Sequence, residues 1–501
     1  MSALSRQSPV AGSAPGDKGL KTGAIGFAAG VVIGVASTAP GYSLAASLGL
    51  VVAVVGIGVY APVIMIVSFI PMVLIAASYY WMNRADPDCG TTFSWATRAM
   101  GPYAGWIGGW AIIVADIIVM ANLAQISGLY LFLLLGISAP STFAVTAVGV
   151  AFIAAMTWIC VIGIELNAKT QTGLLAAELV TLAIFAVVAL VRVYSGDALA
   201  GSIEPSAGWF NPANIGSVGA LTSGVLLAVF IYWGWDSTVS VNEETEDPTE
   251  TPGRAAVLST VILVLIYVLV TVAAVSFGGP ELLTKEAGSG DVLGLLANDV
   301  FGSDLLGKLV IIAVLTSAAA SCQTTILPTA RTALSMARAK ALPAKLGEVS
   351  PQYMTPTFAT WLMGALSIIW YVGLTLVSEN LLFDAIASLG LMIAFYYALT
   401  GYACVIYYRN ELFKSVRNFL LIGVAPLLGA VILTAIFIKS CVDMWDPANS
   451  ESGTAWLGIG PPLVIGLGSL AMGVVLVVLW RLGGHPEFFG RRLETADPGL
   501  L

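Results

Sequence analysis

Apolar residues fill most of the chain in long blocks, and polar residues are concentrated in the short stretches between them. A helix that crosses the hydrocarbon core of a bilayer needs about 20 consecutive, mainly apolar residues. The pattern therefore predicts twelve membrane-spanning helices. Their expected ranges are 23–54, 58–82, 102–135, 142–164, 167–193, 215–241, 255–278, 304–335, 357–377, 384–408, 415–438 and 457–481.

Two of these predicted spans, the first and the sixth, are interrupted near mid-depth by polar and helix-breaking residues. Backbone N–H and C=O groups without partners are costly in hydrocarbon, so irregular backbone persists there only where it lines a protein-enclosed cavity. Because one interruption opens each half of the chain, the pair predicts the substrate site of a secondary transporter. The alternative is a pair of kinks packed against neighbouring helices without a ligand. The interrupted segments are Ser37, Thr38, Ala39, Pro40 and Gly41 in the first span, and Ile231, Tyr232, Trp233, Gly234, Trp235 and Asp236 in the sixth.

Spans one to five and six to ten thus form two units that each begin with a broken helix. Five is an odd number, so equivalent units must cross the membrane in opposite directions, as in an inverted-repeat transporter. We therefore predict an all-α multi-span membrane protein of about twelve transmembrane helices, with two inverted five-helix repeats, broken helices one and six, and two accessory helices. The expected units are a disordered tail at 1–22, repeats at 23–193 and 215–408, the last two spans within 409–482, and a second tail at 483–501.

The lysine and arginine residues of the predicted loops favour one orientation. If the N-terminus is cytoplasmic, seventeen of the 21 basic residues lie on cytoplasmic segments and four on external ones. This asymmetry obeys the positive-inside rule, and an odd number of spans would disrupt it. We therefore expect a multi-pass protein in the lipid bilayer of the cell membrane, with both termini in the cytoplasm.

The composition narrows the functional classes. Hydrophobic residues make up 58% of the chain and charged residues 10%, which is too little charge for the surface of a large soluble protein. The one histidine, His485, lies in the C-terminal tail, and the five cysteines lack the paired spacing of a metal site. We expect no enzymatic activity, no cofactor and no nucleic-acid partner. The acidic loop at 243–247 could trap a metal ion, but a solvated loop is the favoured interpretation.

The broken helices also predict how a zwitterion would bind. A helix that restarts exposes N–H groups whose partial positive charge attracts anions, so we expect a substrate carboxylate at residues 37–41. A helix that stops exposes carbonyl oxygens, which would receive an ammonium group at residues 231–233. Asp236 could contact a substrate amine, carry a proton or cap the second half-helix. It is the one acidic residue in the two interruptions, so a polycationic substrate has little support.

Two further carboxylates lie inside predicted spans, where a charge is costly and commonly marks an ion or proton path. Glu178 is near the centre of span five, and Asp116 is in the middle of span three. We assign proton coupling to Glu178 first and Asp116 second; the alternative is a permanently protonated side chain bonded to a neighbouring helix. In span eight, Ser317 and Ser321 share one helical face. They either join helices or line the cavity, and we predict that they line it.

Two groups of residues resemble the amino acid–polyamine–organocation (APC) family of permeases. The similarity extends over spans one to ten, and the count of twelve spans agrees. It implies a LeuT-like fold, alternating access, and coupled uptake or exchange of amino acids or related amines. It also implies that the loop from 243 to 252 is a cytoplasmic gate. The first group is Tyr232-Trp233-Gly234-Trp235-Asp236 with Glu243-Glu244, Pro248 and Pro252-Gly253-Arg254; the second is Arg331, Met336-Ala337-Arg338, Leu342-Pro343 and Thr355-Pro356.

The chain departs from the family pattern at three places. The glycine-rich break of span one is replaced by the segment 37–41, in which Pro40 lacks an N–H group. The lysine that many members carry in span five, seven residues after Gln171, is replaced by Glu178. The Arg-Asp-Gly motif after span eight reads Arg338-Ala339-Lys340.

The leading hypothesis is therefore a proton-coupled secondary transporter of an amino acid or small amine. Within this class, the alternatives are a sodium symporter and a substrate–product antiporter. A non-transporting nutrient receptor on the same fold should lose the breaks, and both are present. A membrane enzyme would need clustered catalytic residues, which the sequence does not show.

Overall fold

The computed structural model describes residues 18–137, 139–287, 291–377, 381–450 and 452–491. Within these residues, twelve helical segments are long and apolar enough to span a membrane, which confirms the predicted number. Their bounds are Phe27–Ala53 (α1 and α2), Gly58–Ala85 (ending in α3), Pro102–Leu134 (α5), Thr142–Ile162 (α6), Ile164–Ser195 (α7), Val218–Thr238 (α8 and the 3-10 helix η4), Thr251–Lys285 (α9), Asp304–Arg338 (α11), Thr357–Val377 (α12), Asp384–Tyr407 (in α13, Leu381–Tyr407), Val416–Asp443 (α14 to α15) and Pro461–Leu482 (α16).

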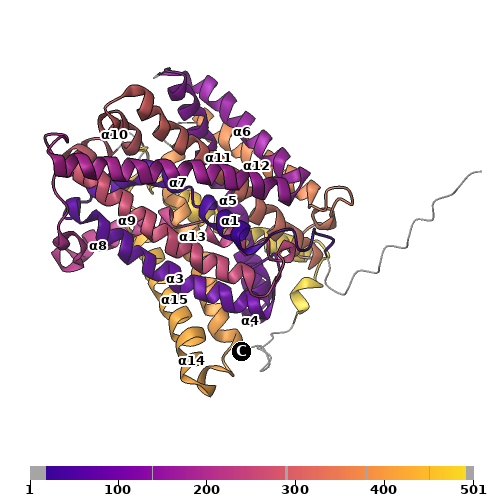
Figure 1. Ribbon diagram of the computed structural model, residues 1–501. Helices are drawn as coiled ribbons and strands as arrows, with labels where there is room; N and C mark the ends of the chain where they lie inside the picture. Colours follow the sequence, from indigo (N-terminus) through magenta and orange to yellow (C-terminus); the bar gives the residue numbers. More distant parts are fainter. Residues whose placement is uncertain (1–17, 138, 288–290, 378–380, 451, 492–501) are drawn as a thin grey trace, which may run out of the picture.

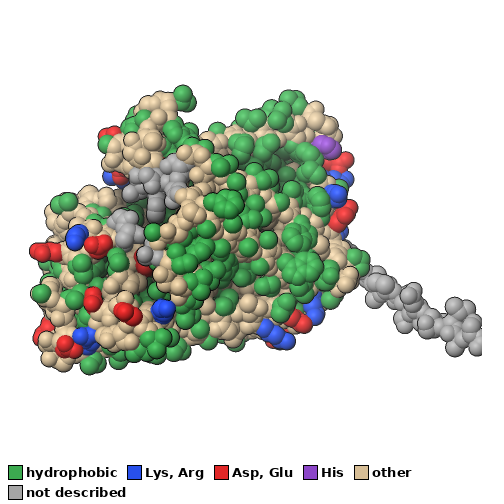
Figure 2. Space-filling view, turned by 90° about the horizontal axis from the view of Figure 1, so that it is seen from above, with side chains coloured by type: hydrophobic (Ala, Val, Ile, Leu, Met, Phe, Trp, Pro, Cys, Tyr) green, Lys and Arg blue, Asp and Glu red, His purple; other side chains and the backbone are tan. Residues whose placement is uncertain are grey.

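The surface has the polarity of a membrane protein. Charged side chains gather at the two ends of the molecule, and a broad hydrophobic face lies between them (Figure 2). Two shorter helices, α4 (Thr92–Met100) and α10 (Val292–Phe301), lie outside the spans. The chain is therefore a multi-pass membrane protein.

The first predicted break is a real interruption of the helix. Helix α1 (Phe27–Ser37) ends, and α2 (Pro40–Ala53) begins with a proline at its first position. Proline suits that position because the first N–H groups of a helix have no intrahelical partner. It also disfavours the helical conformation in the residue before it, and Ala39 is left-handed, with φ 46° and ψ 63°. Pro40 thus explains both the stop and the restart.

The second break is sharper than the first. Helix α8 (Val218–Ile231) ends before Tyr232, and Gly234 has φ 119°. The chain continues as a 3-10 helix, η4 (Trp235–Thr238), and after a turn as a second one, η5 (Asn242–Glu244). Positive φ values are readily adopted by glycine and strained for other residues, so Gly234 permits the change of direction.

The two breaks touch each other. A β-carbon added to Gly234 would lie 2.6 Å from the carbonyl oxygen of Ser37. The hydroxyls of Ser37 and Ser237 are hydrogen-bonded at 2.7 Å, and Ser321 on α11 donates to the carbonyl oxygen of Ser37 at 2.8 Å. The first helix of each half therefore meets the other where its own hydrogen-bond ladder is interrupted.

The architecture confirms the predicted fold class: two inverted five-helix repeats of the LeuT-like kind and two accessory helices. In Figure 1, α1 lies in the middle of the bundle beside α7 and α9, in agreement with their contacts, whereas α14 and α15 lie at one edge. The accessory helices pack on the outside, α15 against α3 and α13, and α16 against α5 and α13. The exact boundaries of the repeats stay a prediction.

Part of each predicted tail packs against the bundle. Lys18 and Leu20, within the tail predicted at 1–22, are buried. At the other end, the buried Phe488 stacks on Phe93, with ring centroids 5.5 Å apart. Residues 1–17 and 492–501 lie outside the described residues.

Gly234→Ala should destabilise the fold because its β-carbon would clash with the backbone of Ser37 and its φ is unfavourable for alanine. Backbone strain of this kind costs about 1–3 kcal/mol. We expect a lower thermal unfolding temperature for the purified protein in detergent. Gly173→Ala, on the surface of α7 with no atom within 4 Å of the added carbon, is the matched control and should not lower it. Equal unfolding temperatures for both variants would show that the breaks are not in tight contact.

Candidate substrate site

The N-terminus of α2 is occupied by groups of the protein itself. Pro40 has no N–H group, Gly41 donates to Glu178 Oε1 at 2.7 Å, and Tyr42 donates to Ser317 Oγ at 3.2 Å. The next N–H group, of Ser43, bonds to Ala39 at 2.8 Å. The N–H groups that the sequence predicts to be free for a substrate carboxylate are therefore not free in this structure.

Glu178 lies on α7 and is fully buried. Its Oε1 atom is held at the positive end of α2, where a carboxylate is favoured by the helix dipole and by the unpaired N–H groups. Among the described residues, its Oε2 atom has no hydrogen-bond partner. Glu178 thus links the last span of the first repeat to the half-helix that follows the first break.

The carbonyl side of the second break is more open. The oxygen of Ile231 accepts from the Tyr267 hydroxyl at 2.6 Å, and the oxygen of Phe230 accepts from the N–H group of Trp233 at 3.0 Å. Within the described part of the chain, no hydrogen-bond donor contacts the carbonyl oxygens of Tyr232 and Trp233. These two oxygens remain able to accept from a ligand.

Asp236 is surrounded by tyrosine hydroxyls. Tyr397 donates to Oδ1 at 2.8 Å and Tyr396 to Oδ2 at 3.2 Å, while Tyr79 is 3.5 Å from Oδ2. The N-cap position of η4 is Gly234, which has no side chain, and the side-chain partners of the Asp236 carboxylate are these tyrosine hydroxyls. The sequence analysis did not identify these tyrosine partners of Asp236. The signal that could have done so is the Tyr396-Tyr397 pair in span ten.

Asp116 lies on α5, is buried, and accepts a hydrogen bond from Thr329 on α11 at 2.9 Å. It lines the same small cavity as Asp236. The sequence placed the two acids in separate spans and gave no indication that they share a cavity. The expectation that Asp236 is the sole acid at the breaks is therefore wrong in three dimensions.

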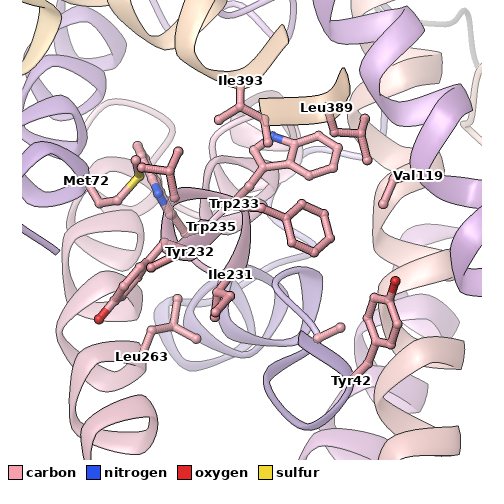
Figure 3. Close-up of a cluster of buried hydrophobic side chains, with 14 of the residues drawn as sticks. Tyr42, Met72, Val119, Ile231, Tyr232, Trp233, Trp235, Leu263, Leu389 and Ile393 are labelled. Atoms are coloured by element: carbon pink, nitrogen blue, oxygen red, sulfur yellow. The ribbon is translucent and has the colours of Figure 1, made fainter. Parts of the chain in front are cut away.

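Two small cavities meet at Trp233 and Ser37. Each has a volume of about 10 Å³, room for about one water molecule. Carboxylate and hydroxyl groups contribute to the walls of the first cavity, whereas the walls of the second are mainly apolar. Figure 3 shows Trp233, Val119 and Tyr42, which line the second. The first is lined by Ser37, Ile112, Asp116, Trp233, Gly234, Asp236, Ser237, Thr325, Pro328 and Tyr396, and the second by Ser37, Thr38, Ala39, Tyr42, Ser43, Val119, Leu123, Phe230, Trp233 and Ser321.

Only some of the remaining predicted site residues line these cavities. Ser321 lines the second cavity, whereas the Ser317 hydroxyl accepts a hydrogen bond from the N–H group of Tyr42 at the N-terminus of α2. The Tyr232 ring points away from the break, since its hydroxyl donates to the carbonyl oxygen of Met65 at 2.9 Å. The buried Trp235 ring packs edge-on against Tyr79, with centroids 5.1 Å apart.

At one end of the molecule, a buried ionic cluster joins the N-terminal segment to the loop before α4, to η5 and to α11. The ammonium group of Lys18 is 2.9 Å from Asp88 and 2.5 Å from Glu243. Beside it, Glu244 and Arg331 form a fully buried pair with hydrogen bonds of 2.5 and 2.9 Å. The sequence interpretation of a solvated acidic loop is wrong for Glu243 and Glu244, because both carboxylates have cationic partners.

Lys18 also decides what this cluster can bind. Asp88, Cys89 and Glu243 place one potential metal-ligand atom each within 4.8 Å of the others. The Lys18 ammonium already contacts all three, at 3.5 Å from the Cys89 sulfur. Burial raises the pKa of the Cys89 thiol well above its ordinary value, and the neighbouring Glu243 adds to this effect. A neutral thiol is a poor metal ligand, so an ammonium group and not a metal ion suits the cluster.

The charges of the Lys18–Asp88 pair persist over a wide pH range. Burial opposes the charge on Lys18, but the carboxylates of Asp88 and Glu243 raise its pKa well above the usual value. Burial also opposes the charge on Asp88, but the Lys18 ammonium and two serine hydroxyls hold its pKa well below the usual range. The pair therefore stabilises the fold between about pH 4 and pH 10, and is lost only as the pH falls through the lowered pKa of Asp88 or rises through the raised pKa of Lys18.

Comparison with known proteins gives consistent matches. The family described as "Amino acid permease" matches residues 23–467. An uncharacterized transporter of Mycobacterium tuberculosis is 27% identical over 378 residues, covering 75% of this chain and 76% of that protein. A low-affinity putrescine importer of Escherichia coli is 21% identical over 406 residues (78% and 82%). A branched-chain amino acid permease of Lactococcus lactis is 25% identical over 308 residues (59% and 64%).

Glu244→Gln and Arg331→Met should each destabilise the protein strongly, because each leaves a buried charge without its partner, at a cost of about 3–5 kcal/mol. The double variant should be more stable than the sum of the two single losses predicts. Thermal unfolding in detergent measures all three. Glu487→Gln, which removes an exposed pair with Lys340, is the control and should change stability by less than about 1 kcal/mol. Additive losses at Glu244 and Arg331 would contradict a direct pair.

Proposed function

Because the chain belongs to the amino acid permease family, we propose that it carries amino acids or related small amines across the cell membrane by proton-coupled secondary transport. The observation that carries the coupling proposal is the bond between Glu178 and the N–H group of Gly41. It places a buried titratable group directly on a broken helix of the site. The relatives described as a putrescine importer and a branched-chain amino acid permease support the two substrate classes.

The substrate, in this proposal, binds between the two breaks. Residues 37–39 of the first break line the two cavities, together with Trp233, Gly234 and Asp236 of the second break, and Ser321 adds a hydroxyl from α11. Since each cavity has room for about one water molecule, the structure corresponds to a closed conformation. Helices around the site must separate before a substrate enters.

Glu178 couples this movement to a proton. As a carboxylate, it is attracted to the positive end of α2 and holds α7 against the first break. When it takes up a proton, it loses the charge that the N–H groups and the helix dipole favour, and α2 is held less firmly. A proton that enters from one side of the membrane can therefore favour one arrangement of α2, and its release on the other side favours the second.

Asp116 is a secondary candidate for proton transfer. Its carboxylate shares the first cavity with Asp236, so the charge of one changes the field at the other. A proton or a substrate cation at either carboxylate would relieve the repulsion between them. We assign the ligand-facing role to Asp236 and the supporting role to Asp116.

The ionic cluster around Lys18 closes one end of the transporter. The basic residues of the loops favour the cytoplasmic side for this end and for both termini. The segment before α1 pairs with the loop after the second break, because the N–H groups of Ala24 and Ile25 donate to the carbonyl oxygen of Glu244 at 2.8 and 3.0 Å. Opening toward the cytoplasm requires these contacts to separate.

The test is uptake of radiolabelled amino acids and amines into proteoliposomes, with an inward proton gradient and protein-free liposomes as the baseline. Wild type should accumulate substrate. Glu178→Gln can still accept from Gly41 but cannot change its charge, so it should lose gradient-driven accumulation, down to the level without a gradient, and retain substrate exchange at equal pH. Glu204→Gln, on an exposed loop, is the matched control and should behave as wild type.

Three other results of the uptake experiment would each favour a different mechanism. Equal accumulation by wild type and Glu178→Gln would remove Glu178 from the coupling mechanism. Uptake driven by a sodium gradient, or only by internal substrate, would replace proton coupling with sodium symport or antiport. Binding without transport under every gradient would favour a receptor.

A further inference from the structure

The N-terminus of α2 and the C-terminus of α8 differ in how far their backbone groups are already hydrogen-bonded. This difference bears on the chemical class of the substrate. A zwitterionic amino acid needs an anion site for its carboxylate and a cation site for its ammonium group. In this structure the anion site at the start of α2 is filled by Glu178 and Ser317. The cation site at the end of α8 keeps the carbonyl oxygens of Tyr232 and Trp233 without a donor from the described residues.

A substrate carboxylate would meet Glu178 at the anion site. The Gly41 N–H group is already bonded to Glu178 Oε1 at 2.7 Å, and a β-carbon at Gly41 would lie 3.3 Å from the same oxygen. Two carboxylates at one site repel each other, and one of them must be neutralised or leave. The N–H groups of α2 therefore offer no attraction to a second anion while Glu178 is in place.

The first cavity is suited to a cation. It is lined by two carboxylates, of Asp116 and Asp236, and none of its described lining residues is Lys, Arg or His. Trp233 and Tyr396 add aromatic rings to its wall, and rings of this kind attract organic cations. An ammonium group entering this cavity meets attractive groups on several sides, whereas a carboxylate meets two carboxylates and no cationic side chain among the described lining residues.

The second cavity is suited to an apolar body. Its walls include Val119, Leu123 and Phe230, and it shares Trp233 with the first cavity. Tyr42, which is 2% exposed, lines it with a hydroxyl that has no hydrogen-bond partner among the described residues. Figure 3 shows the Tyr42 hydroxyl pointing toward Val119. This space can hold the carbon chain of a ligand, with one hydroxyl available to a polar group along it.

We propose that the physiological substrate is a primary amine without a carboxylate group, whose ammonium group binds between Asp236, Asp116 and the carbonyl oxygens of the second break. This inference rests on the proposed transport function and narrows its substrate class. The putrescine importer among the relatives is described by a substrate of this class.

Binding to the full-length protein in detergent tests the proposal, because a ligand that binds the folded state raises the unfolding temperature, and the rise grows logarithmically with the ratio of ligand concentration to Kd. The probes are pairs that differ only in the carboxylate: isopentylamine and leucine, phenethylamine and phenylalanine, putrescine and ornithine. We expect at least one amine to stabilise the protein with an apparent affinity about tenfold or more above that of its amino acid. Binding avoids the passive membrane permeation of neutral amines that complicates uptake assays.

Variants identify the site. Asp236→Asn and Asp116→Asn should each weaken amine binding by about tenfold or more, since each removes a charge-assisted contact or its supporting charge. Glu204 lies on an exposed loop, so Glu204→Gln should fold and bind amines as wild type does. The unliganded unfolding temperature of each variant shows whether it is folded.

Glu178 provides the sharpest comparison. Glu178→Ala removes the group that fills the anion site, so the amino acid of a pair should gain affinity relative to its amine. Glu178→Gln still fills the site with an amide oxygen and should keep the preference for the amine. If Glu178→Ala does not fold, the amine preference of wild type and of Glu178→Gln decides the question.

The outcomes separate this inference from the proposed function. If an amino acid binds wild type as well as or better than its amine, the inference is wrong and the transport function stands. If the amine preference is present but Asp236→Asn and Asp116→Asn leave it unchanged, the assigned binding site is wrong. If neither member of any pair binds, and uptake is absent as well, the proposed function fails together with the inference.

Discussion

The structure depends on one constraint: backbone polar groups inside the hydrocarbon layer must find partners within the protein. Breaking two helices at mid-depth creates several such groups at once. The protein satisfies several of them within each repeat, through Glu178 on Gly41 and Tyr267 on Ile231, and one between the repeats, through Ser321 on Ser37. The breaks are therefore held by α7, α9 and α11 together. A movement of any of these helices changes the hydrogen bonding at the centre.

This dependence links the site to the coupling mechanism. The N–H groups at the start of α2 are hydrogen-bonded in part by a titratable side chain, whereas some carbonyl oxygens at the end of α8 have no donor among the described residues. Glu178 is both the partner that stabilises the half-helix and the group whose charge can change. In the mechanism that we propose, the same contact would bear on substrate choice, through the occupied anion site, and on the energy source, through the proton. At the far end, the pair of Lys18 and Asp88 keeps its charges over the physiological pH range, so it does not add a second pH dependence.

Much of the fold could be predicted from the sequence because span length and helix breaking are local properties. Twelve apolar blocks gave the span number, and Pro40 and Gly234 marked the two breaks. Pairings between distant residues could not be predicted in the same way. Glu178 and Gly41 are 137 residues apart, and no local pattern shows that Asp116 and Asp236 share a cavity. The prediction that the acidic loop after the second break is solvated was wrong for a related reason. The polarity of a sequence segment cannot distinguish a solvated carboxylate from one that is paired with Arg331.

Lys18 has a consequence for the order in which the molecule is assembled. It leaves the ribosome among the first residues, yet its partner Glu243 follows 225 residues later, and Arg338, which donates to the Lys18 carbonyl oxygen, follows 320 residues later. During synthesis Lys18 can pair with Asp88 once two spans have been made, whereas Glu243 follows only after span six and Arg338 at the end of span eight. The cluster is therefore completed in stages, and a nascent chain interrupted before span eight would hold Lys18 with only part of its set of partners.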